Sequence, residues 1–97
     1  MSIYSAAYVG ELNKPVTNQV AVTAISQQLP DMPCKLLFIK NDDTSTVPVY
    51  IGAANVTTLN GFKLTAGEGI AFTCVNANVF YCVATGPGAT IDLISMS

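Results

Sequence analysis

Between residues 47 and 85 the chain reads VPVYIGAANVTTLNGFKLTAGEGIAFTCVNANVFYCVAT. Short runs of β-branched and aromatic residues alternate in this stretch with turn-forming residues, a pattern typical of strands joined by turns. Asn60-Gly61 predicts a tight turn between Thr58-Leu59 and the run 62–64, and Gly67-Glu68-Gly69 predicts a second turn. No window of helical length carries an apolar stripe at helical spacing, so the stretch predicts β structure.

The same pattern continues in both directions along the chain. Pro48 places the run 47–52 at a sheet edge or delays the start of its strand. The predicted strands are 20–25, 34–40, 47–52, 62–64, 70–75, 79–85 and 90–94. About seven short strands at this spacing predict an all-β fold, a compact antiparallel β-sandwich. We expect residues 19–97 to form it as a single domain, which suits a chain of 97 residues.

Residues 1–18 predict an extended N-terminal arm. Its larger apolar residues are separated by small ones, and Asn13-Lys14-Pro15 interrupts any continuing pattern. The segment has too few apolar side chains to pack alone, so we expect it to dock on its own domain or on a neighbouring subunit. The arm residues predicted to make contacts between subunits are Ile3, Tyr4, Tyr8 and Val9.

The runs 70–75 and 79–85 predict a hairpin across residues 76–78. One of its faces would carry Ile70, Phe72, Cys74, Phe80, Cys82 and Ala84, and the other Ala71, Thr73, Val75, Val79, Tyr81 and Val83. Both faces are largely apolar, whereas a sheet with one solvated face should alternate with polar residues. We therefore expect cover on both sides, the second from the arm or another subunit. The predicted interface residues on the hairpin are Val75, Val79, Tyr81 and Val83.

The three cysteines are Cys34, Cys74 and Cys82. The predicted hairpin sets Cys74 and Cys82 diagonally, with Cα atoms about 7–8 Å apart, which is beyond comfortable disulfide reach. An odd number of cysteines without a CxxC spacing fits a reducing compartment, and the first residues do not read as a signal peptide. We expect three small core thiols in a protein made in a cytoplasm.

The composition narrows the classes of function. Only 10% of the residues are charged, against about 25% in a typical soluble protein. This indicates either a β domain with a mildly polar surface or, as we favour, a surface partly buried in an assembly. A net charge of −2, with four scattered lysines, argues against a nucleic-acid partner. The longest apolar run, 36–39, is far shorter than the roughly 20 residues that span a membrane, so we expect no membrane partner.

Few residues carry chemistry. The chain has no histidine, so catalytic triads and imidazole metal ligands are excluded. Asp42-Asp43 fits a solvated turn better than a calcium site, and Glu68 with Asp92 is a remote acid–base alternative. The tyrosines that could stack on sugar rings are Tyr4, Tyr8, Tyr50 and Tyr81. We expect no enzyme activity, no catalytic residue, no cofactor and no metal.

Part of the chain resembles a module of small tailed-phage virion proteins. In that module a VYIG strand leads to a VT..NGF.L..GE segment, here 47–52 followed by 56–68, and later to an ATG.G..I tail, here 84–91. The resemblance covers residues 35–94 and is most like capsid decoration, or cement, proteins. It implies a non-enzymatic protein on the capsid exterior of a virion, made in the host cytoplasm.

The resemblance also implies partners. They would be the major capsid protein, whose adjacent subunits the protein would clamp, and further copies of the chain in a homo-oligomer, a trimer rather than a dimer. The alternative is a tail- or fibre-associated module, or one that binds glycans. The first 34 residues lie outside the resemblance and would supply contacts specific to the partner.

Overall fold

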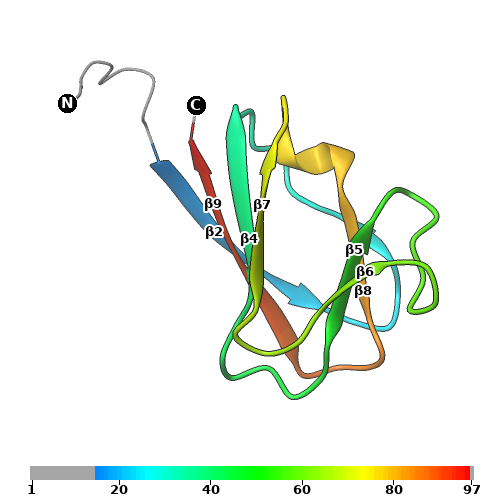
Figure 1. Cartoon of the computed structure of the whole chain (residues 1–97). Coiled ribbons are helices and arrows are strands. Elements are labelled where there is room, and N and C mark those ends of the chain that lie inside the picture. The colour runs from blue at the N-terminus through cyan, green and yellow to red at the C-terminus, as the bar shows by residue number, and fades with distance from the viewer. Residues whose placement is uncertain (1–14, 97) are drawn as a thin grey trace.

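The computed structural model describes residues 15–96, which form two antiparallel sheets of four strands each. The first sheet has the order β2-β9-β4-β7 and the second the order β3-β8-β5-β6 (Figure 1). The strands are β2 (Pro15–Val22), β3 (Gln27–Gln28), β4 (Leu36–Asn41), β5 (Val49–Gly52), β6 (Phe62–Leu64), β7 (Gly69–Thr73), β8 (Tyr81–Ala84) and β9 (Ala89–Met96). The predicted all-β antiparallel sandwich is confirmed.

Side-chain alternation builds the interior of the sandwich. In β4, Leu37 and Ile39 are buried while their neighbours in sequence are more exposed, and in β9 Ile91 and Leu93 behave in the same way. The largest fully buried apolar side chains are Leu37, Ile39, Ile91, Val22 and Val49. Burying one such side chain stabilises the fold by about 1.5–3 kcal/mol, so this layer between the sheets supplies most of the driving force.

One buried polar residue, Asn41, closes the end of β4. Its Nδ2 donates to the carbonyl oxygens of Leu64, at 2.9 Å, and Val47, at 3.3 Å. Its backbone N–H donates to the carbonyl of Glu68 at 2.9 Å, and its own carbonyl accepts from the N–H of Gly67 at 2.7 Å. Asn41 therefore fastens segments of both sheets to one another through hydrogen bonds.

The first sheet begins earlier than predicted. Strand β2 starts at Pro15 and pairs with β9 from Pro15 opposite Met96 to Val22 opposite Ala89. Proline is tolerated as the first residue of an edge strand because its missing N–H is not needed there. The predicted boundary between arm and domain at residues 18 and 19 therefore falls inside β2.

The predicted hairpin of residues 70–85 is wrong. Strand β7 pairs with β4 in the first sheet, whereas β8 pairs with β5 and β3 in the second. Between them lies a short 3-10 helix, η2 (Ala77–Val79), in place of a tight turn. The Asn76 side chain accepts from the N–H groups of Met32 and Asn78 and donates to Asp31, which fixes the chain on a crossing path between the sheets.

The predicted inward face of that segment is nevertheless correct. Cys82 and Ala84 belong to the core, and Ile70, Phe72, Cys74 and Phe80 pack against it. The rings of Phe72 and Phe80 meet across the interior with centroids 4.5 Å apart. The direction of a side chain follows from alternation along its own strand, whichever strand lies beside it. These six side chains therefore face the core although the predicted strand pairing is wrong.

Two further expectations are refined. Strand β5 starts at Val49, directly after Pro48, but lies inside its sheet between β8 and β6. The Asn60-Gly61 turn is wider than a two-residue turn, since the Thr57 carbonyl accepts from the N–H of Gly61 at 3.0 Å. A Cβ atom at residue 61 would lie 2.6 Å from Tyr50 Cβ, so glycine is required there. Thr58 and Leu59 belong to the turn rather than to a strand.

Candidate interaction surface

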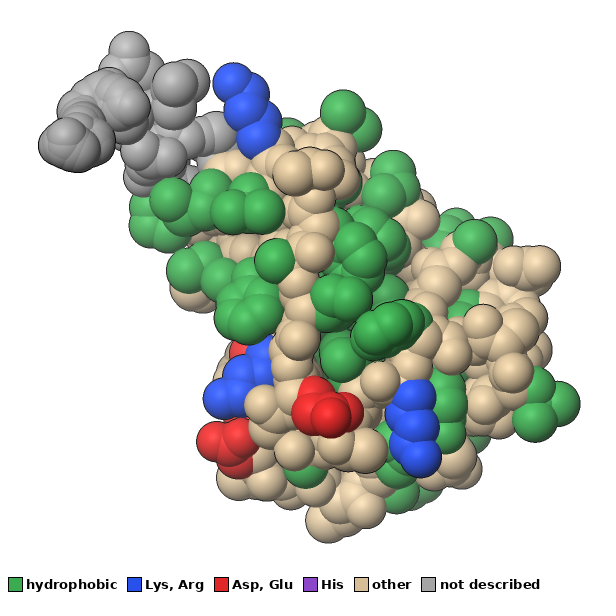
Figure 2. Space-filling view, in the orientation of Figure 1, with side chains coloured by type: hydrophobic (Ala, Val, Ile, Leu, Met, Phe, Trp, Pro, Cys, Tyr) green, Lys and Arg blue, Asp and Glu red, His purple; other side chains and the backbone are tan. Residues whose placement is uncertain are grey.

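The first sheet turns an apolar strip away from the sandwich. Its register sets Phe38 between Ile94 of β9 and Ala71 of β7, and Leu36 between Met96 and Thr73. Phe38 is 42% exposed, Ile94 is 37% exposed, and Leu36 is exposed as well. We call the outward residues of β2, β9, β4 and β7 the outer face. Figure 2 shows hydrophobic side chains gathered along the left of the molecule, above a small charged group.

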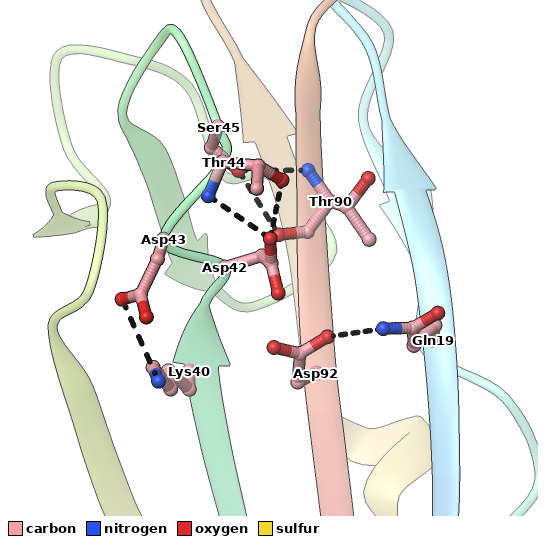
Figure 3. A network of polar contacts seen from close by, with 8 residues as sticks. All are labelled: Gln19, Lys40, Asp42, Asp43, Thr44, Ser45, Thr90 and Asp92. Atoms are coloured by element: carbon pink, nitrogen blue, oxygen red, sulfur yellow. Dashed lines mark hydrogen bonds and ion pairs between the residues drawn. The ribbon is translucent and has the colours of Figure 1, made fainter.

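A polar group borders the strip at the next position along the strands. Lys40 lies opposite Asp92 in the register of β4 and β9, and the Gln19 amide donates to Asp92 at 2.8 Å (Figure 3). Lys40 also forms an ion pair with Asp43, with 3.6 Å between Nζ and Oδ1. The outer face thus combines an apolar strip with a rim that carries both signs of charge.

Phe38 and Ile94 of the strip line an open hollow of about 600 Å³ together with the rim. Its lining residues are Thr17, Asn18, Gln19, Phe38, Lys40, Asp92, Leu93 and Ile94. A concave surface with an apolar part and a few polar groups is suited to receive a protruding group of a partner. This part of the apolar strip is therefore concave as well as exposed to solvent.

The two acids at the rim have opposite electrostatic surroundings. Hydrogen bonds donated by the side chain and backbone of Thr44 lower the pKa of Asp42. Desolvation, together with the neighbouring Asp42 carboxylate, raises the pKa of Asp92, although the bond from Gln19 and the charge of Lys40 oppose this rise.

Strand β2 forms one edge of the first sheet. Its eight residues, PVTNQVAV, carry no charge, and Val16 is exposed. Natural edge strands are usually short, bulged or guarded by lysine, because a long free edge is a template for pairing with another chain. Within residues 15–96 only the proline at its start resembles such a guard.

The predicted interface residues of 70–85 differ widely in exposure. Val75 is 80% exposed beyond β7, Val79 is exposed at the end of η2, and Tyr81 is half-buried in β8. Val83 is only 5% exposed, so it has little surface to offer a partner. The predicted arm residues lie outside the described residues: Ile3, Tyr4, Tyr8 and Val9.

Sequence reasoning missed the outer face, although a signal was present. The run 36–39 is apolar at all four positions. Alternation in β4 buries Leu37 and Ile39 and leaves Leu36 and Phe38 outside. The criterion applied to residues 70–85, apolar side chains on both faces of a strand, would have identified this strip.

Glu68 and Asp92, the remote acid–base alternative, each accept a hydrogen bond from a different residue. The Glu68 carboxylate accepts from the Thr65 N–H at 2.7 Å and closes its own turn, while Asp92 is bonded to Gln19. Within the described part of the chain, no three His, Cys, Asp or Glu side chains gather closely enough to hold a metal ion. Among residues 15–96 we find no helix of the length and apolar character needed to cross a membrane.

The cysteines differ from expectation in which two are neighbours. Cys34 and Cys82 are buried and Cys74 is half-buried, all three as free thiols. The Sγ atom of Cys74 lies 3.2 Å from that of Cys34, whereas Cys82 is in the opposite sheet. The predicted diagonal arrangement of Cys74 and Cys82 is therefore wrong, because β7 and β8 belong to different sheets.

Comparisons with known proteins leave the function open. No family model and no curated protein matches the chain. One solved structure, from work on Bacillus endospore appendages described as a novel family of disulfide-linked pili, is similar over 98% of each chain, with 13% sequence identity and a TM-score of 0.49. We draw nothing about function from a likeness at this level.

Proposed function

We propose that this protein is a non-enzymatic structural protein of a phage virion that decorates the capsid exterior by clamping adjacent major capsid subunits. The observation that carries the proposal is the outer face, where the apolar strip of Leu36, Phe38 and Ile94 is exposed beside the rim of Lys40 and Asp92. The resemblance of residues 35–94 to virion modules supports the choice of partner.

The outer face has the composition of a protein interface. Interface cores are apolar and poor in charge and are surrounded by a polar rim, which is how the strip and rim are arranged. A stable contact removes about 800 Å² from each partner, so the contact would extend from the strip over the rim and neighbouring outward residues. Phe38, at the centre of the strip, is the expected anchor of the contact.

Other kinds of partner are less well supported. The formal charge of −2 gives a phosphate backbone little to bind. Tyr50 and Tyr81 are half-buried, which leaves less of each ring for stacking on a sugar than an exposed aromatic would offer. A role in a tail or fibre would use the same outer face on a different virion protein, so it is an outcome of the test.

The mechanism is mechanical. Each copy adds buried apolar area across the boundary between two capsid subunits, and repetition over a closed shell raises the overall strength through avidity. The protein would act with further copies of itself, as a trimer rather than a dimer. Such a function needs no catalytic residue and no cofactor.

The test is binding to expanded shells assembled from the major capsid protein of the same phage. We expect the protein to sediment with the shells and Phe38→Glu to weaken binding at least tenfold, because a buried unpaired carboxylate is costly. Leu59→Glu is the matched control, since Leu59 is 95% exposed in the turn before β6 and its substitution should leave binding unchanged. Circular dichroism checks that both variants fold.

Two outcomes contradict the proposal. One is that the protein does not bind the shells, and the other is that Phe38→Glu binds as well as the unaltered protein. Cryo-electron microscopy of intact particles then locates the chain. Density on a tail or fibre in place of the capsid would replace decoration by the alternative role.

A further inference from the structure

Two cysteines separated by 40 positions meet where β4 begins and β7 ends. The Sγ atoms of Cys34 and Cys74 are 3.2 Å apart. The Cys34 N–H donates to the Val75 carbonyl at 3.0 Å, and the Cys74 N–H donates to the Lys35 carbonyl at 3.2 Å. An isolated bridge between Pro33 and Asn76 closes the segment beyond both cysteines, so hydrogen-bonded backbone on either side holds the sulfurs close.

The remaining distance is small. A disulfide bond is about 2.05 Å long, so the sulfurs need to approach by a little over 1 Å. Rotation about the Cα–Cβ bonds moves a sulfur by that much without shifting a strand. Cys82 has no such neighbour among the described residues, because it is buried in β8 of the opposite sheet.

We propose that Cys34 and Cys74 form an intrachain disulfide once the protein leaves a reducing compartment. The inference does not depend on the proposed function, since it rests on the two thiols alone. The bond would join the edge strand β7 to β4 at the end of the outer face that carries Leu36. Cys82 would stay a free thiol.

The chemistry requires an oxidant, and a small-molecule disulfide such as oxidised glutathione suffices. The thiolate of Cys74, which is half-buried, attacks one glutathione sulfur, and the other glutathione leaves as a thiolate. The Cys34 thiolate then attacks Cys74 Sγ and releases the second glutathione. The protein loses two protons and two electrons in all, and one glutathione disulfide becomes two glutathione thiols.

The rate of disulfide formation depends on solvent access to the thiols and on the pKa of Cys34. An open hollow of about 320 Å³, lined by Pro33, Cys34, Lys35 and Val75, reaches Cys34. Burial and the neighbouring Cys74 raise the pKa of Cys34 to about 11. Because the thiolate is the attacking species, closure should be slow at neutral pH and faster in mildly alkaline solution.

The experiment incubates the reduced protein with oxidised glutathione at mildly alkaline pH. Free thiols are then alkylated in denaturant and counted by mass spectrometry. We expect the count to fall from three to one, with the loss of two hydrogen atoms in mass and reversal by dithiothreitol. The oxidised protein should unfold several degrees higher than the reduced one, because the bond restricts the unfolded chain.

Variants assign the bond. Trypsin leaves Cys74 and Cys82 on one peptide, since no lysine follows Lys63 and the chain has no arginine. Cys82→Ala removes this ambiguity and should oxidise to a form without free thiols. Cys74→Ala should keep two free thiols or carry glutathione, without an intrachain bond.

Three results would overturn the inference. They are three thiols remaining after prolonged oxidation, a bond that involves Cys82, and cross-linking only between chains. Non-reducing electrophoresis separates the last result from an intrachain bond. None of these results bears on shell binding, so the disulfide and the proposed function stand or fall separately.

Discussion

Asn41 shows how one polar side chain can hold two layers together. It is fully buried, and its Nδ2 satisfies the carbonyl oxygens of Val47 and Leu64, while its Oδ1 has no partner within residues 15–96. A carbonyl left without a donor inside a protein costs about 1–3 kcal/mol. The amide is therefore kept for its donor group rather than for its oxygen.

Asn41→Ala should lower the free energy of unfolding by about 2–4 kcal/mol. The substitution removes the donor to the carbonyl oxygens of Val47 and Leu64 and leaves a cavity. Urea denaturation followed by circular dichroism measures the change. Asn55→Ala is the control, since Asn55 is exposed and a surface change should stay within about 0.5 kcal/mol. Equal effects of the two substitutions would contradict the structural role of Asn41.

Glu68 gives a pH-dependent contribution at the residue scale. The hydrogen bond from the Thr65 backbone to its carboxylate lowers the pKa of Glu68. A lowered folded-state pKa means that the stabilisation is present above the unfolded pKa, near 4.5, and is lost as the pH falls through the folded pKa. The hydrogen bond of Glu68 therefore stabilises the turn before β7 more at neutral pH than in acid.

Glu68→Gln should lower the melting temperature at neutral pH and leave it nearly unchanged in strong acid, where the native carboxyl is protonated as well. Thermal unfolding at a series of pH values compares the two proteins. A difference that persists or grows toward acid would show that the charge of Glu68 does not stabilise the turn.

At the scale of elements, alternation could be predicted from the sequence and pairing could not. Local composition predicts the runs around β4, β8 and β9, and alternation gives the inward side chains of residues 70–84 except Val83, which is buried although it is predicted to face outward. The partner of β7 is β4, about 33 positions earlier in the chain, and no local signal encodes such a distant pairing. Strand β3 could not be predicted from the sequence, because it consists of two polar residues, Gln27 and Gln28.

Strand β9 offers a test of facing within one element. Ile91 is fully buried and Ile94 lies on the outer face. Ile91→Ala should cost about 2–5 kcal/mol of unfolding free energy, whereas Ile94→Ala should cost only about 1–2 kcal/mol, since 37% of that residue is already exposed to water. Chemical denaturation of both variants measures the contrast, and similar costs would be incompatible with the sandwich as described.

At the scale of the whole molecule, the low fraction of charged residues can be related to particular surfaces. The outer face is apolar over the strip of Leu36, Phe38 and Ile94, and β2, an edge strand among residues 15–96, carries no charge. The sequence could indicate that the protein has an unusually apolar surface, because composition reports how much apolar area exists. It could not indicate which surface, because that depends on which strands are neighbours.

The edges of the first sheet bear on the number of copies in an assembly. A dimer with two-fold symmetry would pair β2 with β2, whereas a ring of three needs two different surfaces on each copy. Within residues 15–96, β2 and β7 are the two edge strands of the first sheet and offer two such surfaces. Pairing the β2 edge of one copy with the β7 edge of the next would continue the sheet around a trimer.

Sedimentation velocity tests this assembly. We expect the native protein to sediment as a trimer and Val16→Lys, at the exposed part of β2, to sediment as a monomer, because a lysine on an edge strand opposes pairing with another chain. Leu59→Lys adds the same charge in a remote turn and should stay trimeric. A native monomer would contradict self-association, and a dimer would favour pairing of β2 with β2. A trimer that survives Val16→Lys would move the contact away from the β2 edge.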